Sequence, residues 1–141
     1  EVGDVRCAVA LNGDFRRSGE VAAVLDARRF EVTGLEDRPE GWFADGRLEW
    51  ISGANAGATA QVAVHRAGAA AVLELRRAPE AAAAVGDGLR VFAGCDKTAE
   101  TCRAKFGNLA NHRGFPFMPG EDWITSWPRE DEAHDGGSLF R

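Results

Sequence analysis

Three cysteines carry the most specific chemistry in this sequence. Cys95 and Cys102 flank six residues in the stretch Gly94-Cys95-Asp96-Lys97-Thr98-Ala99-Glu100-Thr101-Cys102, and Cys7 lies almost a whole domain away. An odd number of thiols cannot all pair in disulfides. Thiolates are the ligands that soft metals and iron–sulfur clusters select. The three cysteines therefore either bind a metal together with a fourth ligand or fill space in the interior.

The spacing alone does not decide between these two interpretations. Six intervening residues match neither the short cysteine pairs of zinc ribbons nor a ferredoxin run. Free cysteines are also among the residue types most often buried as small apolar side chains. Arg6, Lys97 and Arg103 lie beside or close to a cysteine, where positive charge favours the thiolate. An exposed, arginine-rich surface is the simpler interpretation of these three charges.

Histidines offer two other kinds of site. His112 follows Cys102 by ten residues and could complete a Cys3His structural zinc site. A cysteine peptidase would instead need His65, His112 or His134 as the base for a reactive thiol. Against that, Cys102 falls inside a predicted helix and Cys95 has no histidine in a recognisable register. His65 is predicted to be an ordinary sheet residue.

Carboxylates and glycines give weaker signals. A glycosidase-like acid and base would have to come from Glu121, Asp122, Glu130 and Asp131, which are typical of a solvated tail. The loop Gly53–Gly57 lacks the lysine and the following helix that a phosphate-binding loop needs. Neither pattern singles out a catalytic site.

The elements that would position the cysteines are mostly strands. Period-2 alternation predicts a hairpin over 20–33 with its turn at 26–28, and strands over 48–51, 61–65, 71–75 and 89–93. Pro79 favours a short helix over 80–85. Thr98 is a candidate N-cap for a helix that runs to Phe106 and ends at Gly107-Asn108. Cys95 and Cys102 are therefore expected at a strand-to-helix corner, where both thiols can turn toward one point.

After residue 111, glycines and prolines exclude long regular structure. The segment still carries the apolar side chains Phe115, Phe117, Trp123, Ile124 and Trp127. We expect an irregular strap whose aromatic residues pack on the sheet or meet neighbouring subunits. The polar, acidic residues 129–141 are expected to form a flexible tail. The predicted organisation is one domain over 1–128 followed by this tail.

Bulk composition restricts the class of protein. The chain has 141 residues and a formal net charge of −5, from 22 acidic and 17 basic side chains. Nucleic acid or an anionic membrane as the main partner would require a basic surface. No apolar run approaches the length of a membrane span. The predicted fold class is mostly β, a small barrel or sandwich with one or two short helices and an irregular aromatic C-terminal strap.

The region 94–120 resembles a known family. Its motifs are the two cysteines, Lys105-Phe106-Gly107-Asn108, Asn111-His112-Arg113-Gly114-Phe115-Pro116 and Pro119-Gly120. They are similar to the C-terminal domain of phage tail-tip proteins, which include the hub protein of alphaproteobacterial gene transfer agents and, more distantly, the lambda tail-tip protein L. The resemblance runs from Glu1 to about Gly137.

The resemblance implies a structural protein and not an enzyme. In that family the hub closes the distal end of the tail tube, and four cysteines of this domain hold an iron–sulfur cluster. By that pattern Cys7, Cys95 and Cys102 would be metal and cofactor ligands of a 4Fe-4S cluster, with the fourth cysteine expected just upstream of Glu1 and zinc as the alternative metal. The implied location is the virion tail tip of a phage or gene transfer agent particle, assembled in the bacterial cytoplasm. The implied partners are other tail-tip and baseplate proteins and further copies of the hub.

Overall fold

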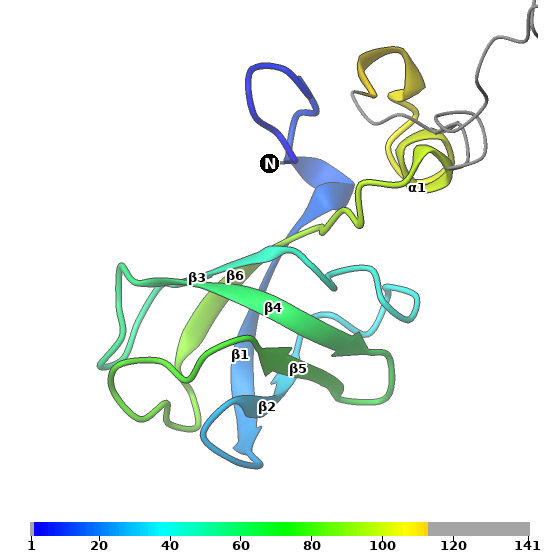
Figure 1. The fold of residues 1–141 in the computed structure, drawn as a ribbon. Helices are drawn as coiled ribbons and strands as arrows, with labels where there is room; N and C mark the ends of the chain where they lie inside the picture. The colour runs from blue at the N-terminus through cyan, green and yellow to red at the C-terminus, as the bar shows by residue number, and fades with distance from the viewer. Residues whose placement is uncertain (1, 113–141) are drawn as a thin grey trace, which may run out of the picture.

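The computed structural model describes residues 2–112, in which six antiparallel strands close into a barrel (Figure 1). The strands follow one another around the barrel in the order β1-β2-β5-β4-β3-β6. Their bounds are β1 Arg16–Val24, β2 Arg29–Thr33, β3 Arg47–Trp50, β4 Thr59–Arg66, β5 Ala71–Leu75 and β6 Gly88–Phe92. Three short helices accompany them: the 3-10 turns η1 Gly13–Phe15 and η2 Leu109–Asn111, and the α-helix α1 Ala99–Ala104.

Alternating apolar residues form the barrel interior. In β5, for example, Ala71, Leu73 and Leu75 are buried while the residues between them are half-exposed. Successive strand side chains point to opposite faces, so this period-2 pattern turns one face of every strand inward. The resulting core contains Val21, Phe30, Val32, Leu35, Phe43, Leu48, Trp50, Val62, Ala71, Leu73, Leu75, Leu89 and Val91.

The long strand β1 closes the barrel. Its first half pairs with β6, from Arg16 opposite Phe92 to Glu20 opposite Gly88. Its second half pairs with β2, and the register shifts between Val21 and Ala23. Such a bulge bends a strand and increases its twist. One strand can therefore border both neighbours and leave no open sheet edge between them.

The helix predicted over 80–85 is wrong. This segment has no helical structure, because polar side chains hold its backbone in place. The Asn55 side chain accepts from the N–H of Ala81 at 3.0 Å and donates to its carbonyl at 2.8 Å. The Asp87 carboxylate accepts from the N–H of Ala84 at 2.9 Å. The Ala81 carbonyl and the Ala84 N–H, which a helix over 80–85 would pair within itself, are bonded to side chains instead.

The N-terminal turn and α1 both lie beyond the same end of the barrel (Figure 1). The chain reaches α1 directly after β6, and the chain before η1 leads into β1, which is the partner of β6. The two ends of the described chain thus meet at one mouth of the barrel. The predicted mostly β class is confirmed, whereas the aromatic strap lies outside the described residues. Between residues 2 and 112, no helix is long and apolar enough to cross a membrane.

Candidate metal centre

Close backbone packing at Gly94 directs the chain from β6 toward the cysteine corner. A Cβ atom at this position would collide with the carbonyl oxygen of Ala44 and the amide of Gly46. The N–H of Gly94 also donates to the carbonyl of Trp42 at 3.3 Å. Only glycine allows two backbones to approach in this way. Cys95 therefore follows a fixed point at the barrel mouth.

A capping network starts α1 between the two cysteines of the corner. The Thr98 hydroxyl accepts from the N–H of Thr101 at 3.1 Å, as an N-cap does. Asp96 accepts from the N–H and the hydroxyl of Thr98, both at 2.9 Å, and from the Thr101 hydroxyl at 3.0 Å. The Thr98 N–H is the main cause of the lowered pKa of Asp96, and the two hydroxyls add to it. An ionised Asp96 therefore fixes the start of the helix that carries Cys102.

Cys102 is the buried thiol of the three. Its Sγ donates to the carbonyl oxygen of Asn108 at 3.3 Å. Burial raises the pKa of the Cys102 thiol, and the neighbouring Cys95 and Cys7 raise it further. The Cys102 sulfur is therefore close enough to the other two cysteines for their charge to affect it. A raised pKa opposes a role as a reactive nucleophile, because the thiolate is the reactive form.

Cys7 lies in an N-terminal turn built by Asp4. The Asp4 carboxylate accepts from the N–H groups of Arg6 and Cys7 at 3.0 and 2.7 Å. The Asn108 side chain then donates to the carbonyl oxygen of Cys7 at 2.5 Å, with its nitrogen 3.8 Å from the Cys7 sulfur. The N-terminal turn is thereby held against the segment that follows α1.

Lys105 fastens the corner to the barrel. Its Nζ donates to the carbonyl oxygens of Trp42 and Gly94 at 2.5 and 2.7 Å. The same ammonium group lies 4.8 Å from the Trp42 ring centroid and 5.3 Å from that of Phe106. Burial lowers the pKa of Lys105, and the nearby Cys95 is the largest opposing influence. A single side chain thus joins the last turn of α1 to the strand–helix corner and to the barrel.

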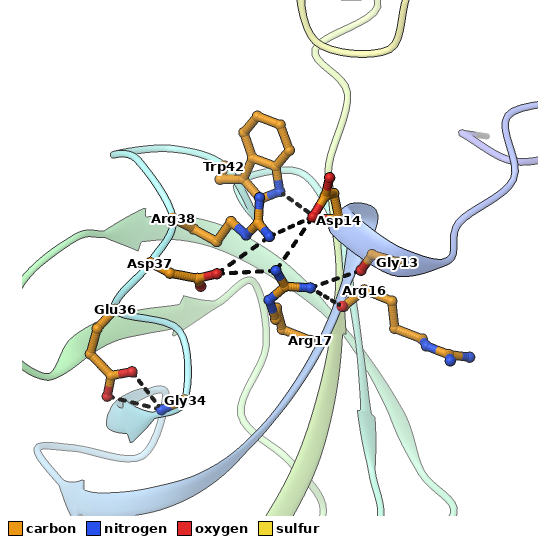
Figure 2. Close-up of polar contacts among 9 residues, drawn as sticks. All are labelled: Gly13, Asp14, Arg16, Arg17, Gly34, Glu36, Asp37, Arg38 and Trp42. Carbon is orange, nitrogen blue, oxygen red and sulfur yellow. Dashed lines mark hydrogen bonds and ion pairs between the residues drawn. The ribbon is translucent and has the colours of Figure 1, made fainter.

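Trp42 is in turn positioned by an ion-pair cluster at the start of β1 (Figure 2). Its indole N–H donates to the backbone carbonyl of Asp14 at 3.3 Å. Arg38 lies over the indole ring and pairs with Asp14 at 2.9 Å. Arg17 pairs with Asp37 at 3.0 Å. Exposed pairs contribute little singly, but this network fixes the orientation of the ring on which Lys105 lies.

All three cysteines and His112 line one cavity of about 1520 Å³ at this end of the barrel. His112 is held by a 3.1 Å contact between its Nε2 and the carbonyl oxygen of Lys97. Three thiols at one cavity form a donor set of the kind that iron–sulfur clusters and zinc select. As the side chains lie within 2–112, no three Cys, His, Asp or Glu residues are gathered closely enough to count as a formed ligand set. The donor types fit a soft metal or an iron–sulfur cluster, whereas their placement in residues 2–112 is not that of a formed ligand set.

Comparison with known proteins identifies the family. A profile described as "Phage conserved hypothetical protein BR0599" matches residues 41–122, more than half of the chain. The chain belongs to this BR0599 family. Cys95 and Cys102 lie inside the segment that the BR0599 profile matches, and Cys7 lies before it.

A solved structure extends the similarity over the remaining residues. It is titled "Virion of native gene transfer agent (GTA) particle", and one of its chains is 38% identical to this BR0599 family member with a TM-score of 0.81. The alignment covers 98% of this chain and 48% of that chain. The protein therefore spans about half the length of its structural relative. No curated protein matches the sequence.

The predicted ligands of this BR0599 protein that lie in residues 2–112 share one cavity but are not gathered into a formed metal site. Cys7, Cys95, Cys102 and His112 line the same cavity. His65 is instead buried in β4 with its ring edge-on to Phe43 at 5.0 Å, as predicted for a sheet residue. His134 and the four candidate carboxylates lie outside the described residues, as do the strap and the tail.

Sequence reasoning missed two residues of the site. Lys105 and Asn108 belong to the Lys-Phe-Gly-Asn motif, which entered the prediction only through the family resemblance. Each contacts residues far away in the sequence, Lys105 across 63 positions and Asn108 across 101. The available signal was a single lysine followed by a glycine that ends the helix, and it does not reveal such contacts.

Proposed function

We propose that this protein is a structural component of a phage-like virion, namely the C-terminal domain of a tail-tip hub. The observation that carries the proposal is the 38% identity over 98% of the chain to a chain of a gene transfer agent particle. The phage description of the matched family agrees with it. The hub role rests on the resemblance of residues 94–120 to tail-tip proteins. Its partners would be other tail-tip and baseplate proteins and further copies of the hub.

The tail-tip assignment is tested on purified particles. Antibody-gold labelling of the domain should decorate the distal end of the tail, and the protein should be found by mass spectrometry in particles but not in tail-less heads. Label distributed along the tube or on the capsid would contradict the hub role. Absence of the protein from purified particles would contradict the virion role itself.

We further propose that Cys7, Cys95 and Cys102 hold an iron–sulfur cluster of the 4Fe-4S type. Support comes from three thiols that line one cavity, two of which raise the pKa of the third, Cys102. In the family pattern a fourth cysteine just upstream of Glu1 completes the ligand set. Bound there, the cluster would supply a covalent cross-link between the N-terminal turn and the strand–helix corner. Structural metal sites contribute directly to folding stability, so this cross-link should stabilise the domain.

Replacement of single ligands tests this second proposal. After anaerobic reconstitution, Cys95→Ser and Cys102→Ser should each melt well below the wild type, by the several kcal/mol that a structural metal contributes. Without metal, Cys95→Ser should melt close to the wild type, because Cys95 is only partly buried. Equal melting of wild type and variants after reconstitution would contradict the cross-link.

A Cys3His zinc site remains the alternative, because His112 lines the same cavity as the three thiols. Zinc would require His112 as a ligand, whereas the cluster would not. His112→Ala should therefore abolish high-affinity zinc binding if the site is a zinc site. If the site holds a cluster completed by a fourth cysteine, iron content should be unaffected by this replacement.

A further inference from the structure

Asn108 contacts two of the three cysteines from one position. Its side-chain nitrogen donates to the Cys7 carbonyl at 2.5 Å and lies 3.8 Å from the Cys7 sulfur. Its backbone carbonyl accepts from the Cys102 sulfur at 3.3 Å, and its N–H donates to the Cys102 carbonyl at 2.9 Å. A half-buried side chain therefore connects residues from opposite ends of the described chain.

The local backbone explains how Asn108 reaches both partners. Gly107 has a positive φ of 59° and ends α1 by turning the chain back, with its N–H bonded to the carbonyl of Arg103 at 3.2 Å. Asn108 then places its main chain beside Cys102 and its side chain toward the N-terminal turn. The Asn111 side chain donates to Oδ1 of Asn108 at 2.8 Å. That bond assigns oxygen and nitrogen of the amide and directs the two N–H donors toward Cys7.

The chemistry of the amide suits a thiolate neighbour. The side-chain NH2 group has two hydrogens, so one can bond the Cys7 carbonyl while the other faces the sulfur. Outer-shell donors of this kind orient metal ligands and stabilise the charge on them. An aspartate of the same shape would present an acceptor and a negative charge to both groups instead.

We propose that Asn108 is a positioning residue that holds Cys7 beside Cys102, so that thiols from both ends of the domain face one site. The reason for holding these thiols together rests on the proposed metal function, whereas the contacts of Asn108 do not depend on it. Its contacts with Cys7 and Cys102 are made between protein atoms alone. Asn108 is not itself a ligand in this arrangement.

The test measures thiol proximity in metal-free protein. Dibromobimane fluoresces only after both of its arms have reacted with thiols, and peptide mass spectrometry then identifies the linked pair. Wild type should give a Cys7–Cys102 link, and Asn108→Asp should lower the fraction of reacted Cys102 that is linked to Cys7 about tenfold, the effect on an equilibrium of losing a hydrogen bond of ordinary net strength. Asn12→Asp is the matched control, since Asn12 makes no side-chain cap bond at η1, and it should leave the yield unchanged.

Two further measurements separate the possible failures. Asn108→Ala removes the donor without adding charge and should also lower the Cys7–Cys102 yield, while far-ultraviolet circular dichroism checks that the barrel is folded. Equal yields in wild type, Asn108→Asp and Asn108→Ala would overturn the inference, whatever metal the protein binds. If instead the yields differ as expected but the reconstituted wild type binds no iron or zinc, the positioning role stands and the proposed metal function fails.

Discussion

Replacing Lys105 by methionine should release the cysteine corner from the barrel while leaving the barrel folded. Methionine keeps the length and most of the apolar contact of the lysine stem, but it loses the ammonium group. The variant loses the hydrogen bonds from Nζ to the carbonyls of Trp42 and Gly94. It also loses the cation–π contacts with the rings of Trp42 and Phe106. The barrel core, by contrast, contains no atom of this side chain.

The expected magnitude follows from these contacts. Hydrogen bonds to a charged group contribute roughly 1.5–3 kcal/mol each, and cation–π contacts at partly exposed sites about 0.5–1 kcal/mol. The contributions are not additive, because one ammonium group makes all of them and loses hydration in doing so. We therefore expect the contact between the cysteine corner and the barrel to lose about 3 kcal/mol. The equilibrium constant for release of the corner from the barrel then rises about a hundredfold.

Thiol labelling of Cys102 in the metal-free protein measures this opening. Cys102 is only 7% exposed, so its labelling rate reports the open fraction when closing is fast. The rate should rise about a hundredfold in Lys105→Met. Lys97→Met is the matched control, because Lys97 is the chain's other lysine and is exposed. Equal Cys102 labelling in wild type and both variants would refute the role assigned to Lys105.

Three further replacements test the barrel and its mouth. Burial lowers the pKa of His65, so the unfolded chain binds the proton more readily and wild-type stability should fall as pH drops below 6.5. Urea unfolding should show that His65→Leu reduces the difference in unfolding free energy between about pH 7 and about pH 5.5, by up to about 1 kcal/mol per pH unit. Gly94→Ala should destabilise by about 2 kcal/mol or more in urea unfolding, because its Cβ collides with the carbonyl of Ala44; a wild-type midpoint would refute that packing. Thr98→Ala should raise the Cys102 labelling rate about fivefold through the loss of about 1 kcal/mol of capping, and an unchanged rate would contradict the capping assignment.

Local sequence patterns predicted most of the strands because burial here follows the side-chain period. The hairpin over 20–33 and the strands near 48, 61, 71 and 89 all appear, with bounds shifted by a few residues. The early part of β1 was missed, since Arg16 and Arg17 lack an alternating apolar signal and pair with β6 instead. Closure into a barrel depends on this pairing between distant segments, so alternation could not separate a barrel from a sandwich.

The candidate site was predicted only in part for the same reason. The cap at Thr98 and the helix that carries Cys102 are local features, and both are confirmed. That Cys7 lines the same cavity agrees with what the family resemblance implied. The contacts of Lys105 and Asn108 are made across 63 and 101 positions of sequence, and local propensity contains no information about them. The helix expected over 80–85 does not form, because the side chain of the distant Asn55 bonds the backbone of Ala81.

Iron and acid-labile sulfide content, measured with the visible absorption spectrum after anaerobic reconstitution, tests the proposed metal centre most directly. The protein should extend far enough upstream of Glu1 to include the expected fourth cysteine. Iron and sulfide bound in equal amounts, with a brown colour that is lost in Cys102→Ser, is the predicted result. A colourless protein without iron and sulfide, or one that binds zinc alone, would contradict an iron–sulfur cluster at Cys7, Cys95 and Cys102.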